Sequence, residues 1–97
     1  MLIVAGYIDV APEGRAEFLA ARMTTIAATR EEPGCLEYTF AADATDPGRV
    51  RVFERWETAD DLETHLARLS TRPQSTVEVI GRELLRYEIS DIGPLRP

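Results

Sequence analysis

The residues best suited to chemistry in this chain are its only histidine, His65, its only tryptophan, Trp56, and its tyrosines. An imidazole titrates near neutral pH, so His65 is the leading candidate for a general base. The alternative is a histidine that packs in the core and bonds to a backbone carbonyl. Trp56 could form a wall against a flat aromatic ligand, or it could close one end of the core. The residue types alone leave these alternatives open.

Tyrosine and arginine side chains add candidates for ligand binding. Tyr38 and Tyr7 lie in strand-like segments, where a phenol can contact a ligand oxygen or simply pack. Arg55 and Arg86 could stabilise an anionic group through charge-assisted hydrogen bonds, although most exposed arginines are solvated surface residues. We predict catalytic roles for His65, Trp56 and Tyr38, and substrate-binding roles for Tyr7, Arg55 and Arg86.

Two other reactive groups are interpreted as structural. Glu54 alternates with Val52 and Trp56, which places a carboxylate inward or at an interface, where it needs a hydrogen-bond donor. An arginine across a dimer interface would be such a donor. Cys35 has no histidine near it in sequence to activate its thiol, so we interpret it as a packing residue.

The composition excludes several classes of protein. With 97 residues and a net charge of −6, the chain fits one domain and is unsuited to binding phosphate backbones. One cysteine and one histidine cannot build a familiar zinc site, and no nucleotide-binding or G-x-S-x-G motif is present. No apolar run approaches the about 20 residues of a membrane span, and no signal peptide is recognisable. We expect a cytoplasmic protein without nucleic acid, membrane, metal or organic cofactor.

Hydrophobic patterning predicts the elements that position these residues. Residues 2–10 are apolar and β-branched and indicate a strand, and the apolar spacing over residues 15–30 indicates a helix that ends at Pro33-Gly34. In that helix Arg15, Arg22 and Arg30 are placed mostly opposite the apolar face. Residues 35–42 and 50–57 alternate around the turn Asp46-Pro47-Gly48, which predicts an antiparallel hairpin.

A second helix carries the histidine. Thr58 and Asp61 resemble a capping box that opens it. Spacing then places four residues on one stripe, Leu62, His65, Leu66 and Leu69. His65 should therefore point toward the sheet, and we predict one cavity there that Trp56 and Tyr38 or Tyr7 share with it.

The C-terminal third completes the predicted domain. Residues 74–80 indicate a short helical piece ended by Gly81, and residues 83–89 a last strand. The order β-α-β-β-α-β predicts an α+β, ferredoxin-like split βαβ fold with a four-stranded antiparallel sheet. One domain is expected over residues 1–97, with a core over 1–90 and an extended tail over 91–97.

Apolar side chains occupy both faces of the predicted strands, with Phe53 on one side and Trp56 on the other. Helices in this fold cover only one face. The other is either tolerated as an open face or covered by a partner. We favour a homodimer whose sheets pack face to face.

The stretch from Glu31 to His65 resembles the antibiotic biosynthesis monooxygenase family, with its pattern E-x-G-C-x-x-Y, then D-P, E-x-W and a helical His. The resemblance implies a dimeric α+β barrel. It also implies, for some relatives, oxidation of polycyclic phenols, hydroquinones or anthrones by molecular oxygen without a prosthetic group. In that chemistry the substrate's own anion supplies the electron. The protein removes a proton, stabilises the anion and excludes water.

A subset of the family degrades haem with an Asn in the first strand and a Trp and a His around the second helix. Here residues 3–8 contain no Asn, His65 stands near the expected Trp position, and Trp56 precedes the helix. We therefore predict a cofactor-independent monooxygenase acting on an aromatic, quinol or polyketide-like substrate. The alternatives are a cyclase or isomerase on a similar substrate, and a ligand-binding or stress-response protein without turnover.

Overall fold

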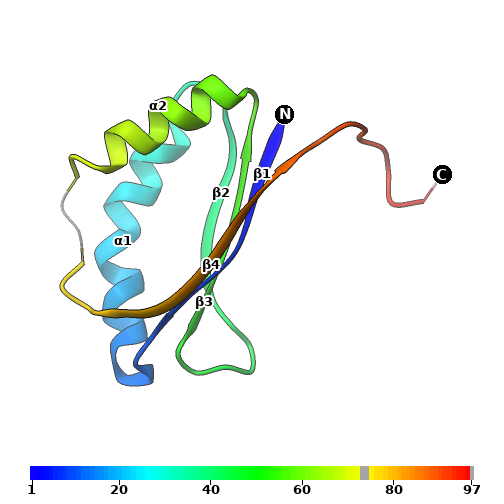
Figure 1. Ribbon diagram of the computed structural model, residues 1–97. Helices are drawn as coiled ribbons and strands as arrows, with labels where there is room; N and C mark the ends of the chain where they lie inside the picture. The colour runs from blue at the N-terminus through cyan, green and yellow to red at the C-terminus, as the bar shows by residue number, and fades with distance from the viewer. Residues whose placement is uncertain (73–74, 97) are drawn as a thin grey trace.

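The computed structural model describes residues 1–72 and 75–96. Its elements are β1 Leu2–Val10, η1 Pro12–Gly14, α1 Arg15–Arg30, β2 Cys35–Ala42, β3 Arg49–Trp56, α2 Ala59–Leu69 and β4 Val79–Glu88. The four strands form one antiparallel sheet in the order β2-β3-β1-β4, and both helices cover the same face of it (Figure 1). The predicted ferredoxin-like α+β fold is confirmed.

The connections before β2 and α2 meet at one corner of the fold. Gly34 has φ +80°, and a side chain there would collide with Asp61, so this turn requires glycine. The Thr58 hydroxyl accepts a hydrogen bond from the Asp61 amide at 3.1 Å and donates one to its carboxylate at 2.8 Å. This cap fixes where α2 begins and how it approaches β2.

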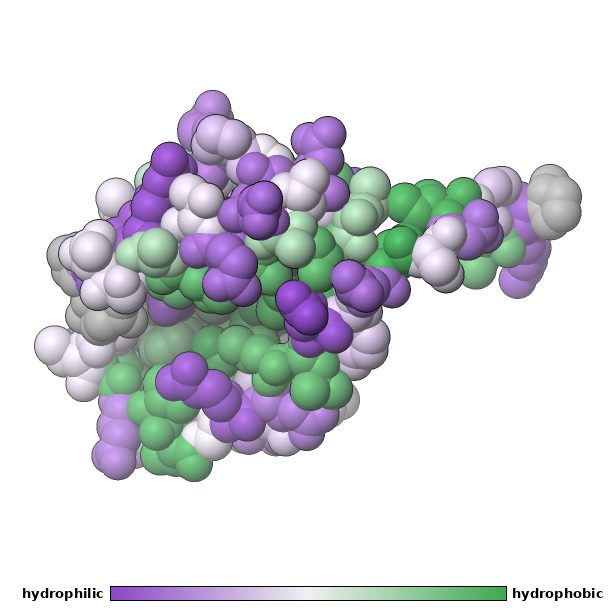
Figure 2. All heavy atoms as spheres, turned by 45° about the horizontal axis from the view of Figure 1, so that its top comes forward, coloured by the Kyte–Doolittle hydropathy of each residue, from purple (hydrophilic) through white to green (hydrophobic). Residues whose placement is uncertain are grey.

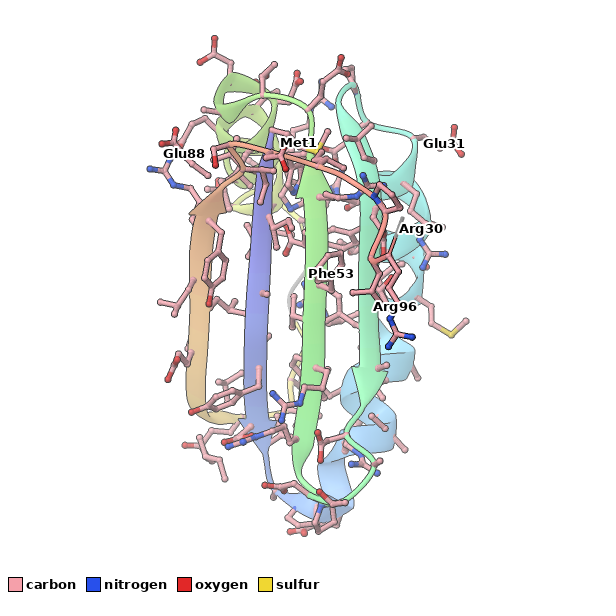
Figure 3. All side chains as sticks on the ribbon, turned by 90° about the vertical axis from the view of Figure 1, so that its right-hand side faces the viewer. Met1, Arg30, Glu31, Phe53, Glu88 and Arg96 are labelled. Atoms are coloured by element: carbon pink, nitrogen blue, oxygen red, sulfur yellow. The ribbon has the colours of Figure 1, made fainter. Side chains whose placement is uncertain are left out.

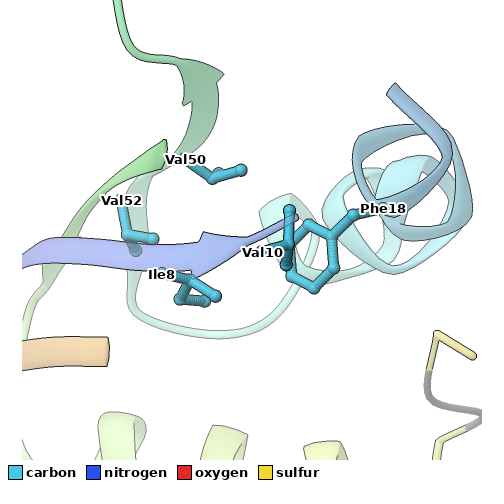
Figure 4. Packing of buried hydrophobic residues seen from close by; sticks show 5 residues of the cluster. All are labelled: Ile8, Val10, Phe18, Val50 and Val52. Atoms are coloured by element: carbon cyan, nitrogen blue, oxygen red, sulfur yellow. The ribbon is translucent and has the colours of Figure 1, made fainter. Parts of the chain in front are cut away.

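The core divides into two clusters beneath the helices. The first contains Ile8, Val10, Phe18, Val50 and Val52 and joins the start of α1 to the central strands (Figure 4). The second contains Tyr38, Trp56 and Leu62 and joins α2 to the β2–β3 hairpin. The strands contribute alternate residues to these clusters, as the period of two requires.

The segment after α2 differs from the prediction of a helical piece over residues 74–80. Gln74 lies outside the described residues, residues 75–78 form neither helix nor strand, and Val79 and Ile80 already belong to β4. The prediction is wrong because Val79 pairs with Val10 beyond a bulge, and Val77 packs on the first cluster. Short apolar runs do not distinguish helix from strand. Here pairing with the edge of β1 that β3 leaves free makes residues 79 and 80 part of a strand.

The other face of the sheet carries no helix among the described residues (Figure 3). Phe53 lies near the middle of this face, and Leu85 and Tyr87 of β4 are each 47% exposed. Beyond β4 the chain leaves the sheet, and Leu95 is 96% exposed (Figure 1). Within the described part of the chain, no helix is long and apolar enough to cross a membrane.

Candidate active site

A cavity of about 510 Å³ lies between α2, the helix-covered face of the sheet and the segment that leads into β4. Side chains from both helices and all four strands line it, among them Phe18, Phe40, Leu62, Leu69, Val77 and Leu84. The surface seen from this side is hollowed, and hydrophobic side chains line the hollow (Figure 2). Its volume falls in the range of roughly 300–1,000 Å³ typical of small-molecule sites.

His65 lines this cavity and is 1% exposed. Its Nδ1 lies 3.3 Å from the Glu32 carboxylate, which also accepts a hydrogen bond of 2.9 Å from Arg72 and has Arg68 at 3.7 Å. In neutral imidazole, donation from Nδ1 leaves Nε2 as the acceptor. Burial lowers the pKa of His65 and outweighs the opposite effect of Glu32, which keeps the ring neutral near pH 7.

Aromatic rings hold the imidazole in place. The Trp56 ring lies 4.7 Å from that of His65 at 31°, and the Tyr38 ring lies 5.3 Å away at 70°. Tyr38 lines the cavity, and burial is the main cause that raises the pKa of its phenol to about 12. Trp56 is fully buried and is not a lining residue, so it supports His65 from behind and does not share the cavity as predicted.

Glu54 is a buried carboxylate that also lines the cavity. It accepts a hydrogen bond of 2.9 Å from the Trp56 indole, which supplies the donor that the sequence required within the same strand. Burial raises the pKa of Glu54, against the effects of the Trp56 hydrogen bond and of Arg22. The E-x-W motif therefore forms a buried hydrogen-bonded pair next to the cavity.

Arg22 was missed by the sequence reasoning, which placed it mostly opposite the apolar face of α1. Its guanidinium instead lines the cavity, with Cζ 4.4 Å from the centroid of the Phe40 ring and 5.6 Å from that of Phe18. The signal was present, because Arg22 follows the buried Phe18 by four residues and i, i+4 positions share a helix face. Glu32 was missed as well, although it begins the E-x-G-C pattern.

The predicted substrate-binding residues lie on two different faces of the sheet. Arg86 lines the cavity together with Arg82. Tyr7 lies on the opposite face of the sheet, where the Arg49 guanidinium stacks 3.6 Å above its ring. Arg55 is on that face too, 3.5 Å from Glu37. Both residues alternate with the side chains that face the helices, so neither shares the cavity with His65.

The sequence profile of the antibiotic biosynthesis monooxygenase family matches residues 1–71, and the chain therefore belongs to this family. An uncharacterized protein of Synechocystis is 39% identical over 64 residues, which cover 66% of this chain and 44% of that protein. The chain thus matches less than half the length of this relative.

Solved structures of other proteins share the fold, among them two that cover nearly all of this chain. A proposed antibiotic biosynthesis monooxygenase from Deinococcus radiodurans is 24% identical, with all of both chains covered and a TM-score of 0.83. The haem-degrader MhuD of Mycobacterium tuberculosis, solved with two haems in its active site, is 17% identical, with 96% of this chain and 100% of that chain covered and a TM-score of 0.72.

The cavity does not match the haem-degrading pattern. The β1 residues that line it are Val4 and Ile8, and no asparagine or glutamine is among the described lining residues. His65 has Nδ1 on Glu32 and its ring against Trp56 and Tyr38, within a buried cluster. The described residues also contain no group of three or more His, Cys, Asp and Glu arranged to hold a metal ion.

Proposed function

We propose that this protein oxidises a planar phenolic or quinol-type substrate with molecular oxygen and without a cofactor of its own. The observation that carries the proposal is the buried Glu32–His65 pair at the wall of an apolar cavity. A base of this kind, in a cavity whose apolar walls exclude water once a substrate fills it, generates the substrate anion that such chemistry needs. Membership of the family supports the assignment.

The residues act in the following order. Neutral His65 accepts the substrate hydroxyl proton at Nε2, and Glu32 stabilises the resulting imidazolium through Nδ1–H. Because Arg72 and Arg68 hold Glu32, the carboxylate keeps its position during the transfer. The substrate anion then reduces oxygen and combines with it to form a peroxide. The peroxide takes back the proton from His65 and loses water, which leaves a ketone or quinone that carries one oxygen atom of O2. The apolar walls protect the reacting anion from protonation by water. Glu32 is a positioning residue in this scheme, and His65 is the catalytic base.

The dimer forms part of the proposal. The strand register places Leu85 and Tyr87 on the same helix-free face as Phe53. Their side chains leave an apolar area, and a second copy that packs its own sheet there would bury it. The cavity lies on the opposite face, so each protomer would hold one site. We expect the dimer to act in the cytoplasm, as the sequence predicts.

Oxygen consumption tests the proposed reaction. The protein is incubated with hydroquinones, anthrones and naphthols in an oxygen-electrode cell, and flavin and metal contents are assayed alongside. We expect uptake with at least one substrate, and its retention after treatment with chelator. Product formation without oxygen uptake would indicate the cyclase or isomerase alternative. Binding without any product would indicate a ligand-binding protein.

A further inference from the structure

The proton transfer proposed above leaves unused one arginine of the cavity wall, the partly buried Arg22. Arg22 Nε is buried and has no hydrogen-bond partner among the described residues. The face of the guanidinium is covered by the Phe40 ring at 4.4 Å. A buried donor without a partner is costly, since it loses its hydrogen bonds to water and gains none in return. Such a donor at a cavity wall is available to a ligand.

Arg22 also acts on the polar groups around it. Its charge favours the ionised forms of Glu54 and Tyr38 and disfavours protonation of His65. One guanidinium from α1 therefore reaches groups on β2, β3 and α2. An anionic oxygen placed among these groups would be stabilised by the positive charge of Arg22.

The charges of the cavity wall also favour an anion. Among the described residues that line the cavity are three arginines, Arg22, Arg82 and Arg86, and two carboxylates, Glu54 and Glu63. This excess of positive charge occurs in a chain whose net charge is −6. Glu54 is the buried one of the two carboxylates, and its charge and that of Arg22 attract each other.

We propose that Arg22 binds the anionic oxygen of the ligand, so that the cavity selects planar aromatic molecules that carry a phenolate or carboxylate. The inference rests on the proposed function in taking this cavity as the substrate site. It requires no turnover. Glu54 competes with the ligand for the same guanidinium, so the two residues have opposite effects on the affinity for an anion.

Binding of 2-naphthoate and of its neutral isostere 2-naphthamide, measured by calorimetry under argon, tests this inference. Wild-type protein should bind naphthoate several-fold more tightly than naphthamide. Arg22→Gln should weaken naphthoate by about tenfold, the scale of one charge-assisted hydrogen bond, and change naphthamide less than about twofold. Glu54→Gln should strengthen naphthoate binding. Arg55→Gln removes the same charge from the opposite face and should change neither affinity.

Arg22→Lys provides a second test should Arg22→Gln fail to fold. It retains the charge without the planar donor array, so it should bind naphthoate more weakly than wild type but still more tightly than it binds naphthamide. Equal affinity of wild type for the two probes, equal losses for both in Arg22→Gln, or no naphthoate binding at millimolar concentration would overturn the inference. Preference for the anion without oxygen uptake would refute only the proposed reaction. Oxygen uptake that depends on His65, with naphthoate affinity unchanged in Arg22→Gln, would refute only this inference.

Discussion

Replacement of His65 by glutamine separates chemistry from packing at the proposed site. Glutamine can still bond to Glu32, but it cannot accept the substrate proton at neutral pH. Loss of a positioned general base lowers turnover roughly 100-fold, or about 2.7 kcal/mol of transition-state free energy. The effect should appear in kcat more than in KM, because the base acts mainly in the transition state.

The structural cost of the same change can be estimated from the ring contacts. The imidazole packs at 4.7 Å from Trp56 and 5.3 Å from Tyr38. Two such aromatic contacts contribute about 2 kcal/mol, which corresponds to a loss of about 8–16 °C in Tm for a domain of this size. Circular dichroism at the assay temperature shows whether the variant is folded when its rate is measured. Arg55→Gln, on the other face of the sheet, is the matched control.

Glu32→Gln tests the positioning role within this prediction. Because Glu32 raises the pKa of His65, its loss should move the acid limb of the rate profile to lower pH while turnover decreases. If Glu32 had a purely structural role, the acid limb of the pH–rate profile would stay at the same pH in Glu32→Gln. A folded His65→Gln variant that oxidises the substrate at the wild-type rate would refute the reasoning, and the proton would then have to leave by another route.

Three further predictions concern stability and assembly. Gly6→Ala should lower the free energy of unfolding by about 2 kcal/mol or more in urea titrations, because φ at Gly6 is +153° and a Cβ there would collide with the Glu83 carbonyl. Gly93→Ala is the control, and it should change the free energy of unfolding little because no atom lies within 4 Å of a Cβ at that position. The pKa of His65 in the folded protein is below 6.5, so the unfolded chain takes up a proton first as the pH falls through that value, and the melting temperature should decrease there. His65→Gln should remove this part of the pH dependence of the melting temperature. Phe53→Asp should dissociate the dimer in light-scattering measurements; a wild-type protein that is a folded monomer at micromolar concentration would contradict the dimer itself.

Local patterns predicted most of the fold. Alternation identified β1, β2 and β3 to within a residue at each end, and helical spacing placed His65 on the sheet side of α2. These patterns are local consequences of backbone geometry, with periods of two and 3.6 residues. The prediction failed at residues 74–80, where a short apolar segment is compatible with either period and pairing with β1 decided in favour of strand.

The assignment of side chains to the cavity depended on tertiary structure. Alternation states that Tyr7 and Arg55 share one face of their strands, but their exclusion from the cavity follows from the face on which both helices pack. Trp56 shares the correct face and is nevertheless sealed behind His65 by Leu62 and Tyr38. Alternation along a strand therefore predicts the face on which a side chain lies, but not whether that side chain reaches the cavity.

The sequence by itself determined the order of the four strands and two long helices, and the family, because each depends on residue types and spacings within short segments. Only the tertiary structure brought Glu32 to His65 across 33 positions and placed Arg22 beside Phe40. Such pairs depend on how α1 and α2 lie against the sheet and against each other. That arrangement results from the packing of the whole core, which no local pattern specifies.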